Sequence, residues 1–348
     1  MKKMLALLMA LLMVVMAFAA CGAKQEAPAE EPAAEETTAA EAPAEEAPKS
    51  ELIEDGLDGK GVKVGIVVKS LADQYWTLVK AGADDATAAY GNELTFIAPN
   101  SEADVQKQVE NIETLTSAGV DVICIAPSND ETVLPALQTA VDQGIKVIAV
   151  DTDSSLPDKA SFIGTGNESA AKEGAAWAAK EVGEGAKAIV LRGRLGDATQ
   201  DAREAGIKAG LEEGKVEILE VQAADSTEEK GMQVSENLLN KYDKVDLIIT
   251  TADSMAVGAM NAVEKGGYEG VKIMGFDGTV PGVQNVVDGK WLGTTAQSPY
   301  NMGVLAVTNA IKLAKGEKIE ERIDSGQTVV GPDNAAEFLA DLKAKAGE

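Results

Sequence analysis

The feature that most constrains the fold is a regular alternation of short, apolar, β-branched runs with stretches of helical length. The first run covers residues 62–68, and an amphipathic stretch from about residue 76 to residue 90 follows it. Strands that alternate with helices in this way form parallel sheets through right-handed crossovers, with helices on both faces. The pattern continues through runs at 94–98, 120–126 and 147–150 and restarts with runs at 188–191, 216–221, 247–250, 272–276 and 294–296. We therefore predict an α/β fold with two doubly wound parallel-sheet lobes.

Charge and composition exclude several classes of function. The 348-residue chain has a formal net charge of −26, which disfavours binding to the phosphates of nucleic acids. It contains no histidine, and so it lacks the commonest general base and metal ligand. No Gly-x-Gly-x-x-Gly follows the first predicted strand, and no Walker loop is present. We expect no nucleic-acid partner, no cofactor, no metal site and no catalytic residues.

The amino terminus has the form of an export signal. Lys2 and Lys3 precede an apolar stretch at 4–20, which is too short to be read as a spanning helix of the mature protein. The small residues before Cys21 resemble the lipobox of bacterial lipoproteins, with Phe18 where leucine is usual. The resemblance implies that residues 1–20 are a signal peptide and that the sulfur of Cys21 carries a lipid. Residues 21–60 are rich in Ala, Pro and Glu, which predicts a disordered acidic tether.

Polar and aromatic residues follow the predicted strands in both halves. In open parallel sheets, ligands bind beyond the carboxyl ends of the strands. Carboxylates accept hydrogen bonds from hydroxyls, arginine donates several, and aromatic faces cover C–H surfaces. These properties suit a sugar or another small polyol. The candidate ligand-binding residues are Asp73, Tyr75, Trp76, Asp151, Arg203, Asp253, Asp277 and Gln297.

Each candidate also has a purely structural interpretation. Asp253 could be a helix N-cap, and Arg203 could form a solvated ion pair with Asp201 or Glu204. Tyr75 and Trp76 could belong to the core at the start of a helix. A shared site is favoured because several polar groups fall at the same place in successive strand-helix units, together with an arginine and two adjacent aromatic residues.

These segments resemble the ribose- and galactose-binding type of periplasmic binding protein, over residues 60 to about 332. The most specific parts are Gly-Phe-Asp-Gly-Thr at 275–279 and Ala-Gln at 296–297. The resemblance implies that Tyr75 and Trp76 stack on a sugar. It also implies polar ligand contacts, with Asp73 replacing an asparagine; the matching positions are Asp151, Arg203, Asp277 and Gln297.

Three positions depart from that pattern. Thr152 stands where an arginine is expected, Ala252 where an asparagine is expected, and Ser226 where an aromatic residue is expected. The changes remove a guanidinium, an amide and a stacking face, so they argue against ribose itself. Another pentose, a hexose, a deoxy sugar, a cyclic polyol or a small furanone is compatible with them.

The resemblance further implies a type I periplasmic binding protein whose lobes are joined by a three-segment hinge. The chain would cross near residues 165, 298 and 325, which gives a first lobe at 61–165 and 298–324 and a second at 166–297 and 325–348. A helix at about 334–345 would dock on the second lobe. A ligand that contacts both lobes would favour their closed state.

The same resemblance implies that the chain delivers a sugar or polyol to the membrane permease of an ABC importer, and we expect it to be a monomer. It would be lipid-anchored on the extracytoplasmic face of the bacterial cell membrane, or in the periplasm where there are two membranes. Three alternatives remain: a lipoprotein that senses a nucleoside or a quorum signal, a sugar-responsive repressor, and an exported carbohydrate-active enzyme. The export signal and the lack of a basic helix-turn-helix argue against the repressor. No general acid in a distinct environment supports the enzyme.

Overall fold

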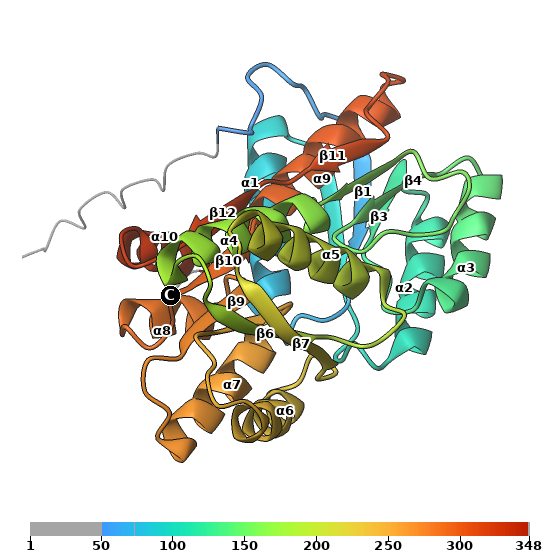
Figure 1. Cartoon of the computed structure of the whole chain (residues 1–348). Helices are drawn as coiled ribbons and strands as arrows, with labels where there is room; N and C mark the ends of the chain where they lie inside the picture. The colour runs from blue at the N-terminus through green and yellow to red at the C-terminus, as the bar shows by residue number, and fades with distance from the viewer. Residues whose placement is uncertain (1–50, 73, 347–348) are drawn as a thin grey trace, which may run out of the picture. The chain divides into compact units, whose positions relative to one another are not determined.

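The computed structural model describes residues 51–72 and 74–346, which form two six-stranded sheets (Figure 1). The first sheet has the order β11-β5-β4-β3-β1-β2 and the second β12-β10-β9-β8-β6-β7. All neighbours are parallel except β10 and β12. The first sheet contains β1 (Lys63–Val67), β2 (Glu93–Ile97), β3 (Val122–Ile125), β4 (Lys146–Val150), β5 (Ser161–Gly164) and β11 (Arg322–Asp324). The second contains β6 (Lys187–Arg192), β7 (Glu217–Ala223), β8 (Leu247–Thr250), β9 (Lys272–Asp277), β10 (Gly293–Gln297) and β12 (Gln327–Val330).

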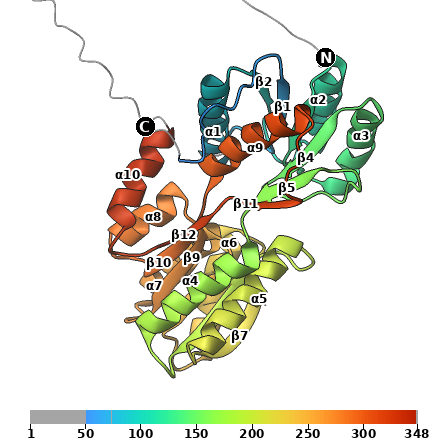
Figure 2. The same cartoon turned by 90° about the horizontal axis from the view of Figure 1, so that it is seen from above.

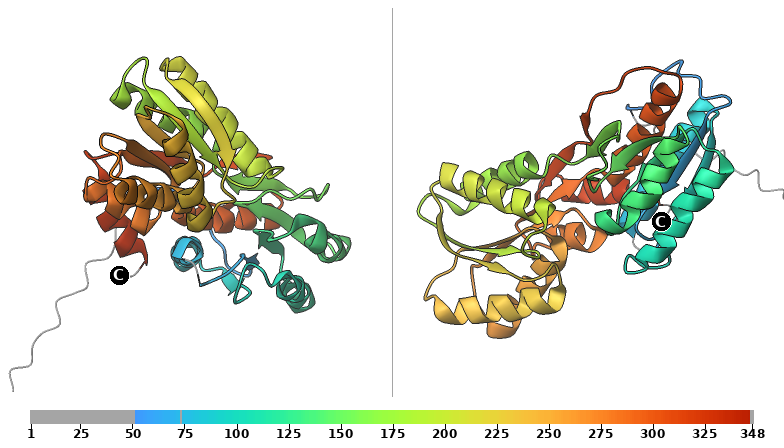
Figure 3. Two further views of the ribbon diagram at one scale, coloured as in Figure 1. Left: turned by 60° about the horizontal axis from the view of Figure 1, so that its bottom comes forward. Right: turned by 90° about the vertical axis from the view of Figure 1, so that its right-hand side faces the viewer.

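Helices cover both faces of each sheet, which explains why the strands read as nearly continuous apolar runs. In the first lobe, Ile66 packs with α1 and α9, whereas the next residue, Val67, packs with α2 and α3. In the second lobe, strands lie between α4 with α5 and α6 with α7 (Figure 3). The helices are α1 (Gln74–Tyr90), α2 (Val105–Ala118), α3 (Asp130–Asp142), α4 (Asn167–Val182), α5 (Ala198–Glu213), α6 (Glu228–Lys241), α7 (Asp253–Gly266), α8 (Val280–Val287), α9 (Pro299–Ala314) and α10 (Ala335–Ala346). The predicted fold class, two doubly wound α/β lobes, is confirmed.

The helix α1 is held close to α9, which comes from near the other end of the chain (Figure 2). A Cβ atom on Gly82 would lie 2.0 Å from the carbonyl oxygen of Tyr300, and one on Gly303 would lie 2.0 Å from that of Val79. Only glycine permits this approach of the two backbones. The contact fixes the position of α1, whose first turn carries Tyr75 and Trp76.

The chain changes sheets three times, after β5, after β10 and between β11 and β12. The crossing segments are hydrogen-bonded to one another. Thr165 Oγ1 donates to Gln297 Oε1 (3.0 Å), Arg322 Nη2 donates to the carbonyl of Thr165 (3.1 Å), and Ser325 N donates to the carbonyl of Gly164 (3.1 Å). The lobes are thus joined by a hinge of three segments, and the lobe bounds at 165, 298 and 325 stay predictions.

The two ends of the described chain differ from expectation. Leu52, Ile53 and Leu57 pack against the core of the first lobe, although the predicted tether was expected to reach residue 60. The helix α10 packs on α8 of the second lobe, as predicted, but it also contacts α1 of the first lobe. The predicted signal peptide, Cys21 and most of the tether lie outside the described residues. Within 51–72 and 74–346, no helix combines the length and the apolar character needed to cross a membrane.

Candidate functional site

A cleft of about 490 Å³ lies at the carboxyl ends of the strands of both sheets. It is lined by six of the eight predicted ligand-binding residues: Tyr75, Trp76, Asp151, Arg203, Asp277 and Gln297. Asp253 lies behind this wall, as described below, and Asp73 lies outside the described residues. The structure therefore brings together side chains that are up to 222 residues apart, as in the pair Tyr75 and Gln297.

The first lobe contributes an aromatic pair and a carboxylate. Tyr75 and Trp76 are in the first turn of α1, with ring centroids 5.0 Å apart and planes at 81°. Tyr75 Oη donates to Asp151 Oδ1 at 2.5 Å, and burial together with this carboxylate raises the pKa of Tyr75 well above its ordinary value. Trp76 is 3% exposed and its Nε1 donates to Glu102 Oε1 at 3.0 Å. Trp76 is thus both a core residue and a wall of the cleft.

Lys69 supplies a cation that the sequence analysis missed. Its Nζ lies 3.9 Å from Asp151 Oδ2 and 5.7 Å from the centroid of the Trp76 ring, and the residue lines the cleft. The expected arginine at position 152 is absent, and the Thr152 hydroxyl instead donates to Asp151 Oδ2 at 2.8 Å. The cation beside Asp151 thus comes from the loop after β1 and not from position 152. A lysine just after the apolar run 62–68 was the available signal.

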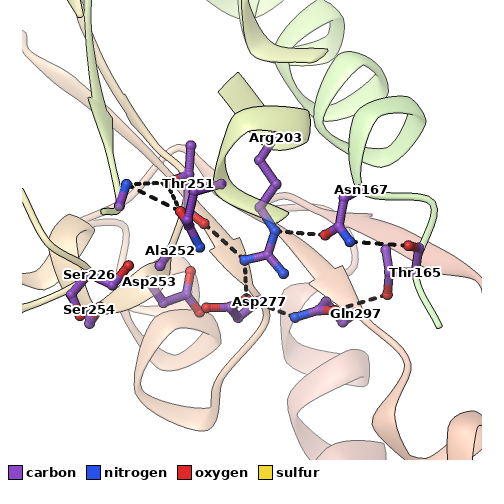
Figure 4. A network of polar contacts seen from close by, with 12 residues as sticks. Thr165, Asn167, Arg203, Ser226, Thr251, Ala252, Asp253, Ser254, Asp277 and Gln297 are labelled. Atoms are coloured by element: carbon purple, nitrogen blue, oxygen red, sulfur yellow. Dashed lines mark hydrogen bonds and ion pairs between the residues drawn. The ribbon is translucent and has the colours of Figure 1, made fainter. Parts of the chain in front are cut away.

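The second lobe contributes a buried ion pair (Figure 4). Arg203, on α5, is 5% exposed, and its Nη1 donates to Asp277 Oδ1 at 2.9 Å and to the carbonyl of Thr251 at 3.0 Å. Its Nε donates to Asn167 Oδ1 at 2.8 Å. Gln297 Nε2 donates to the same Asp277 oxygen at 2.9 Å. Charge-assisted hydrogen bonds in a buried setting fix the carboxylate at the cleft wall.

The alternative partners considered for Arg203 are bound elsewhere. Arg192 Nη2 donates to Asp201 Oδ1 at 2.6 Å, and its Nη1 donates to Glu204 Oε2 at 2.7 Å. Arg203 lies on α5 with Asp201 and Glu204, but its side chain bonds to Asp277. The interpretation of Arg203 as a solvated ion-pair residue is therefore wrong.

Two of the carboxylates that line the cleft, those of Asp151 and Asp277, have unusual backbone angles. Asp151 has φ 62° and Asp277 has φ 124°, at the ends of β4 and β9, which occupy equivalent positions in the two sheets. Non-glycine residues rarely adopt these angles, and such strain persists where surrounding structure enforces it, often at binding sites. Burial raises the pKa of Asp277, while Arg203 and Gln297 oppose that shift.

Asp253 has a supporting position. It is 1% exposed, and its carboxylate accepts bonds from the Thr279 amide and hydroxyl, both at 2.8 Å, and from the Thr294 hydroxyl at 2.7 Å. It does not hydrogen-bond to the first amides of its own helix, so it is not a side-chain N-cap. Its neighbours Ala252 and Ser254 line the cleft instead. Asp253 thus holds the turn that follows Asp277. The pKa of Asp253 is raised to about 7, mainly by burial and to a smaller extent by the charge of Asp277.

The raised pKa of Asp253 makes the stability depend on pH. Because the folded value of about 7 exceeds the ordinary 3.8, the folded state keeps a proton that the unfolded chain loses. The contribution to the free energy of unfolding is complete below about pH 4 and is lost as the pH rises to about 7, at up to about 1.4 kcal/mol per pH unit. Asp253→Asn is expected to flatten this part of the profile in urea unfolding. An unchanged slope would show that another group causes the dependence.

The three departures from the sugar-binding pattern all lie at the cleft. Thr152, Ser226 and Ala252 line it, the first from one lobe and the others from the second. Their side chains are smaller than those expected there, so the cleft has room that an arginine, an aromatic ring and an asparagine would fill.

Elsewhere, Cys124 is buried and its pKa is raised to about 12 by burial, which suits a core residue rather than a nucleophile. The described residues contain no cluster of acidic or cysteine ligands suited to a metal ion.

Comparisons relate the chain to other proteins. Residues 64–318 match a family model described as periplasmic binding protein domain. The ribose import binding protein of Haemophilus influenzae is 35% identical over 260 residues, covering 75% of this chain and 88% of that protein. A solute-binding protein from Burkholderia graminis in complex with D-arabinose is 29% identical, with a TM-score of 0.68 and coverage of 80% and 97%. One from Bacillus halodurans with bound myo-inositol is 25% identical, with a TM-score of 0.70 and coverage of 82% and 99%.

Proposed function

This chain belongs to the periplasmic binding protein family, and from that premise we propose that it is the extracytoplasmic solute-binding component of an ABC importer. It captures a sugar or a sugar-like polyol by closing its hinge and presents it to the membrane permease. The relatives named above are a ribose import protein and proteins with bound arabinose or inositol, which supports a neutral polyhydroxy ligand.

The observation that carries this proposal is the convergence of hydroxyl-binding groups from both lobes on one cleft. Asp151 and Lys69 lie on the first lobe, and Asp277 and Arg203 on the second. Their present hydrogen bonds lie within each lobe, from Tyr75 to Asp151 and from Arg203 to Asp277. A ring with hydroxyls on opposite edges can bond to both sets at once.

Such a ligand explains hinge closure. A polyol held by one lobe leaves half of its hydroxyls facing water, whereas in the closed state it bonds to both lobes. It therefore binds the closed state more tightly and shifts the population toward it. Trp76 and Tyr75 offer aromatic surface to the C–H face of the ring. Gln297, whose amide joins Asp277 to the hinge residue Thr165, links occupancy of the cleft to the crossing segments.

A ligand panel tests the function. Purified protein is screened by thermal shift and calorimetry against D-ribose, D-arabinose, D-allose, xylitol and myo-inositol. A ligand present at about 100 times its Kd stabilises the folded state by about 2.7 kcal/mol. At least one member is expected to give this shift together with a decrease in radius of gyration in X-ray scattering. Failure of every sugar and polyol to bind would contradict the proposal.

We further propose that the protein is anchored to the membrane through Cys21. Support comes from the small residues before this cysteine and the basic, apolar segment that precedes them. Acyl chains bind membranes by burying methylene groups, and two or more chains give stable anchoring. The globular part would then stay close to the importer at the end of its acidic tether.

Replacement of Cys21 is expected to release the protein from the membrane. Cys21→Ser should abolish incorporation of labelled palmitate and move the protein from the membrane fraction to the soluble fraction. The chain has two cysteines, so Cys124→Ala is the matched control and should remain labelled and membrane-bound. Equal labelling of the Cys21 variant and the parent would rule out this anchor.

A further inference from the structure

A second cavity, of about 480 Å³, adjoins the cleft on the other side of Tyr75. The two cavities share four lining residues, Tyr75, Ser254, Asp277 and Thr279. The second cavity is thus adjacent to the cleft, and both border on the Tyr75 ring and the end of β9. A ligand bonded to Asp277 lies at the boundary between the two.

The walls of the second cavity differ from those of the cleft. Beyond the shared residues, one carboxylate lines the second cavity, that of Asp253, which Thr279 and Thr294 already bond. The rest of that wall is mostly aliphatic: Leu78, Val257, Val280, Pro281, Pro299 and Leu342. The cleft, by contrast, has many charged groups. Five charged side chains line it in addition to the four shared residues: Lys69, Glu102, Asp151, Asp197 and Arg203. The pair of cavities therefore offers a polar chamber for hydroxyls and an apolar chamber beside it.

The C-terminal helix contributes to the apolar chamber. Leu342, on α10, lines it together with Leu78 of α1 in the first lobe and Val257 of α7 in the second. The helix is fixed there because Leu339 packs in the core of the second lobe and Lys345 lies over the Tyr300 ring, 5.0 Å from its centroid. Residue 342 lies beyond the family match at 64–318.

We propose that the apolar chamber is a subsite for an apolar substituent on the bound polyol, so that the ligand class is a glycoside with an aliphatic or aryl aglycone. The inference rests on the proposed function and specifies its ligand. The sugar ring occupies the cleft, and the aglycone passes between Tyr75 and Asp277 to contact Leu78, Val257 and Leu342. Burial of each methylene group of the aglycone favours binding by about fourfold.

Matched glycosides test this subsite. Calorimetry compares methyl and n-butyl β-glycosides of ribose, allose and glucose on the purified protein, with the free sugars as reference. The butyl compound has three additional methylenes, so it is expected to bind between about 10-fold and 60-fold more tightly than the methyl compound. Val257→Thr, which replaces a methyl group by a hydroxyl in the chamber, should reduce this ratio by about fivefold or more.

Two further variants sharpen the test. Val287→Thr makes the same change at an exposed position at the end of α8 and should leave the ratio unchanged. Val257→Phe fills the chamber and should remove the preference for butyl while the methyl glycoside still binds. Butyl and methyl glycosides of equal affinity would overturn the subsite and leave the sugar-binding function intact. If Val257→Phe weakened the binding of the butyl and methyl glycosides equally, the subsite would also be overturned. The chamber wall would then contribute to closure of the lobes and not to contact with the aglycone. No binding of any sugar or glycoside would overturn the function and the subsite together.

Discussion

Arg203→Ala is expected to weaken ligand binding by between about 30-fold and several thousand-fold. Truncation of one partner of a buried, hydrogen-bonded charge pair costs about 2–5 kcal/mol in binding. Arg203 is the buried cation beside Asp277, and its five donors also hold Asn167 and the carbonyl of Thr251. Its loss leaves the Asp277 carboxylate with Gln297 as its remaining side-chain donor at the cleft wall. Titration calorimetry against the ligand identified by the panel measures the change.

The same substitution is expected to destabilise the free protein. Breaking a buried ion pair by removing one partner typically costs about 3–5 kcal/mol, because the remaining charge is buried without compensation. Lys208→Ala is a matched control on the same helix, since Lys208 forms an exposed ion pair with Glu204. It should change neither Kd nor the urea midpoint appreciably. Parent-like affinity of Arg203→Ala would exclude Arg203 from the ligand site.

Trp76→Ala is expected to lower the free energy of unfolding by about 3–5 kcal/mol, the usual cost of removing a large aromatic side chain from a core. Trp76 is 3% exposed and belongs to the cluster that joins α1, α9 and the first sheet. Ligand affinity should fall as well, because the ring forms a wall of the cleft and packs edge to face with Tyr75. Denaturant unfolding and calorimetry measure the two effects separately.

Trp177 provides the control that separates stability from binding. It packs in the core of the second lobe, against Gly293 and Gly331, and does not line the cleft. Trp177→Ala should therefore destabilise the protein without changing Kd under conditions where it remains folded. Trp76→Phe should keep most of the stability while losing the bond to Glu102. If Trp76→Ala and Trp177→Ala had the same affinity as the parent, Trp76 would be a core residue only.

Much of the fold could be predicted because parallel strands covered on both faces give apolar runs that are visible without tertiary information. The run at 62–68 and its counterpart at 188–191 became β1 and β6, which occupy equivalent places in the two sheets. Residues just after such runs lie at one edge of each sheet, so Asp151 and Asp277 could be identified as facing the cleft. The packed segment at 52–57 was missed because a few apolar residues in an acidic stretch show no periodicity.

The amino-acid sequence by itself determined the alternation of elements, the two lobes and the strand ends where a ligand binds, because these depend on local hydrophobic periodicity. The tertiary structure decided which of the candidate side chains line the cleft and which support it from behind. Asp253 and Asp277 both follow strands, yet Asp253 turns toward Thr279 and Thr294, and Arg203 rather than Arg192 reaches the cleft. The contact of Lys69 with Asp151 and the chamber lined by Leu342 likewise emerge only when segments far apart in the chain meet. The direction of a side chain depends on the neighbours that satisfy its charge and hydrogen bonds, and local sequence does not specify those neighbours.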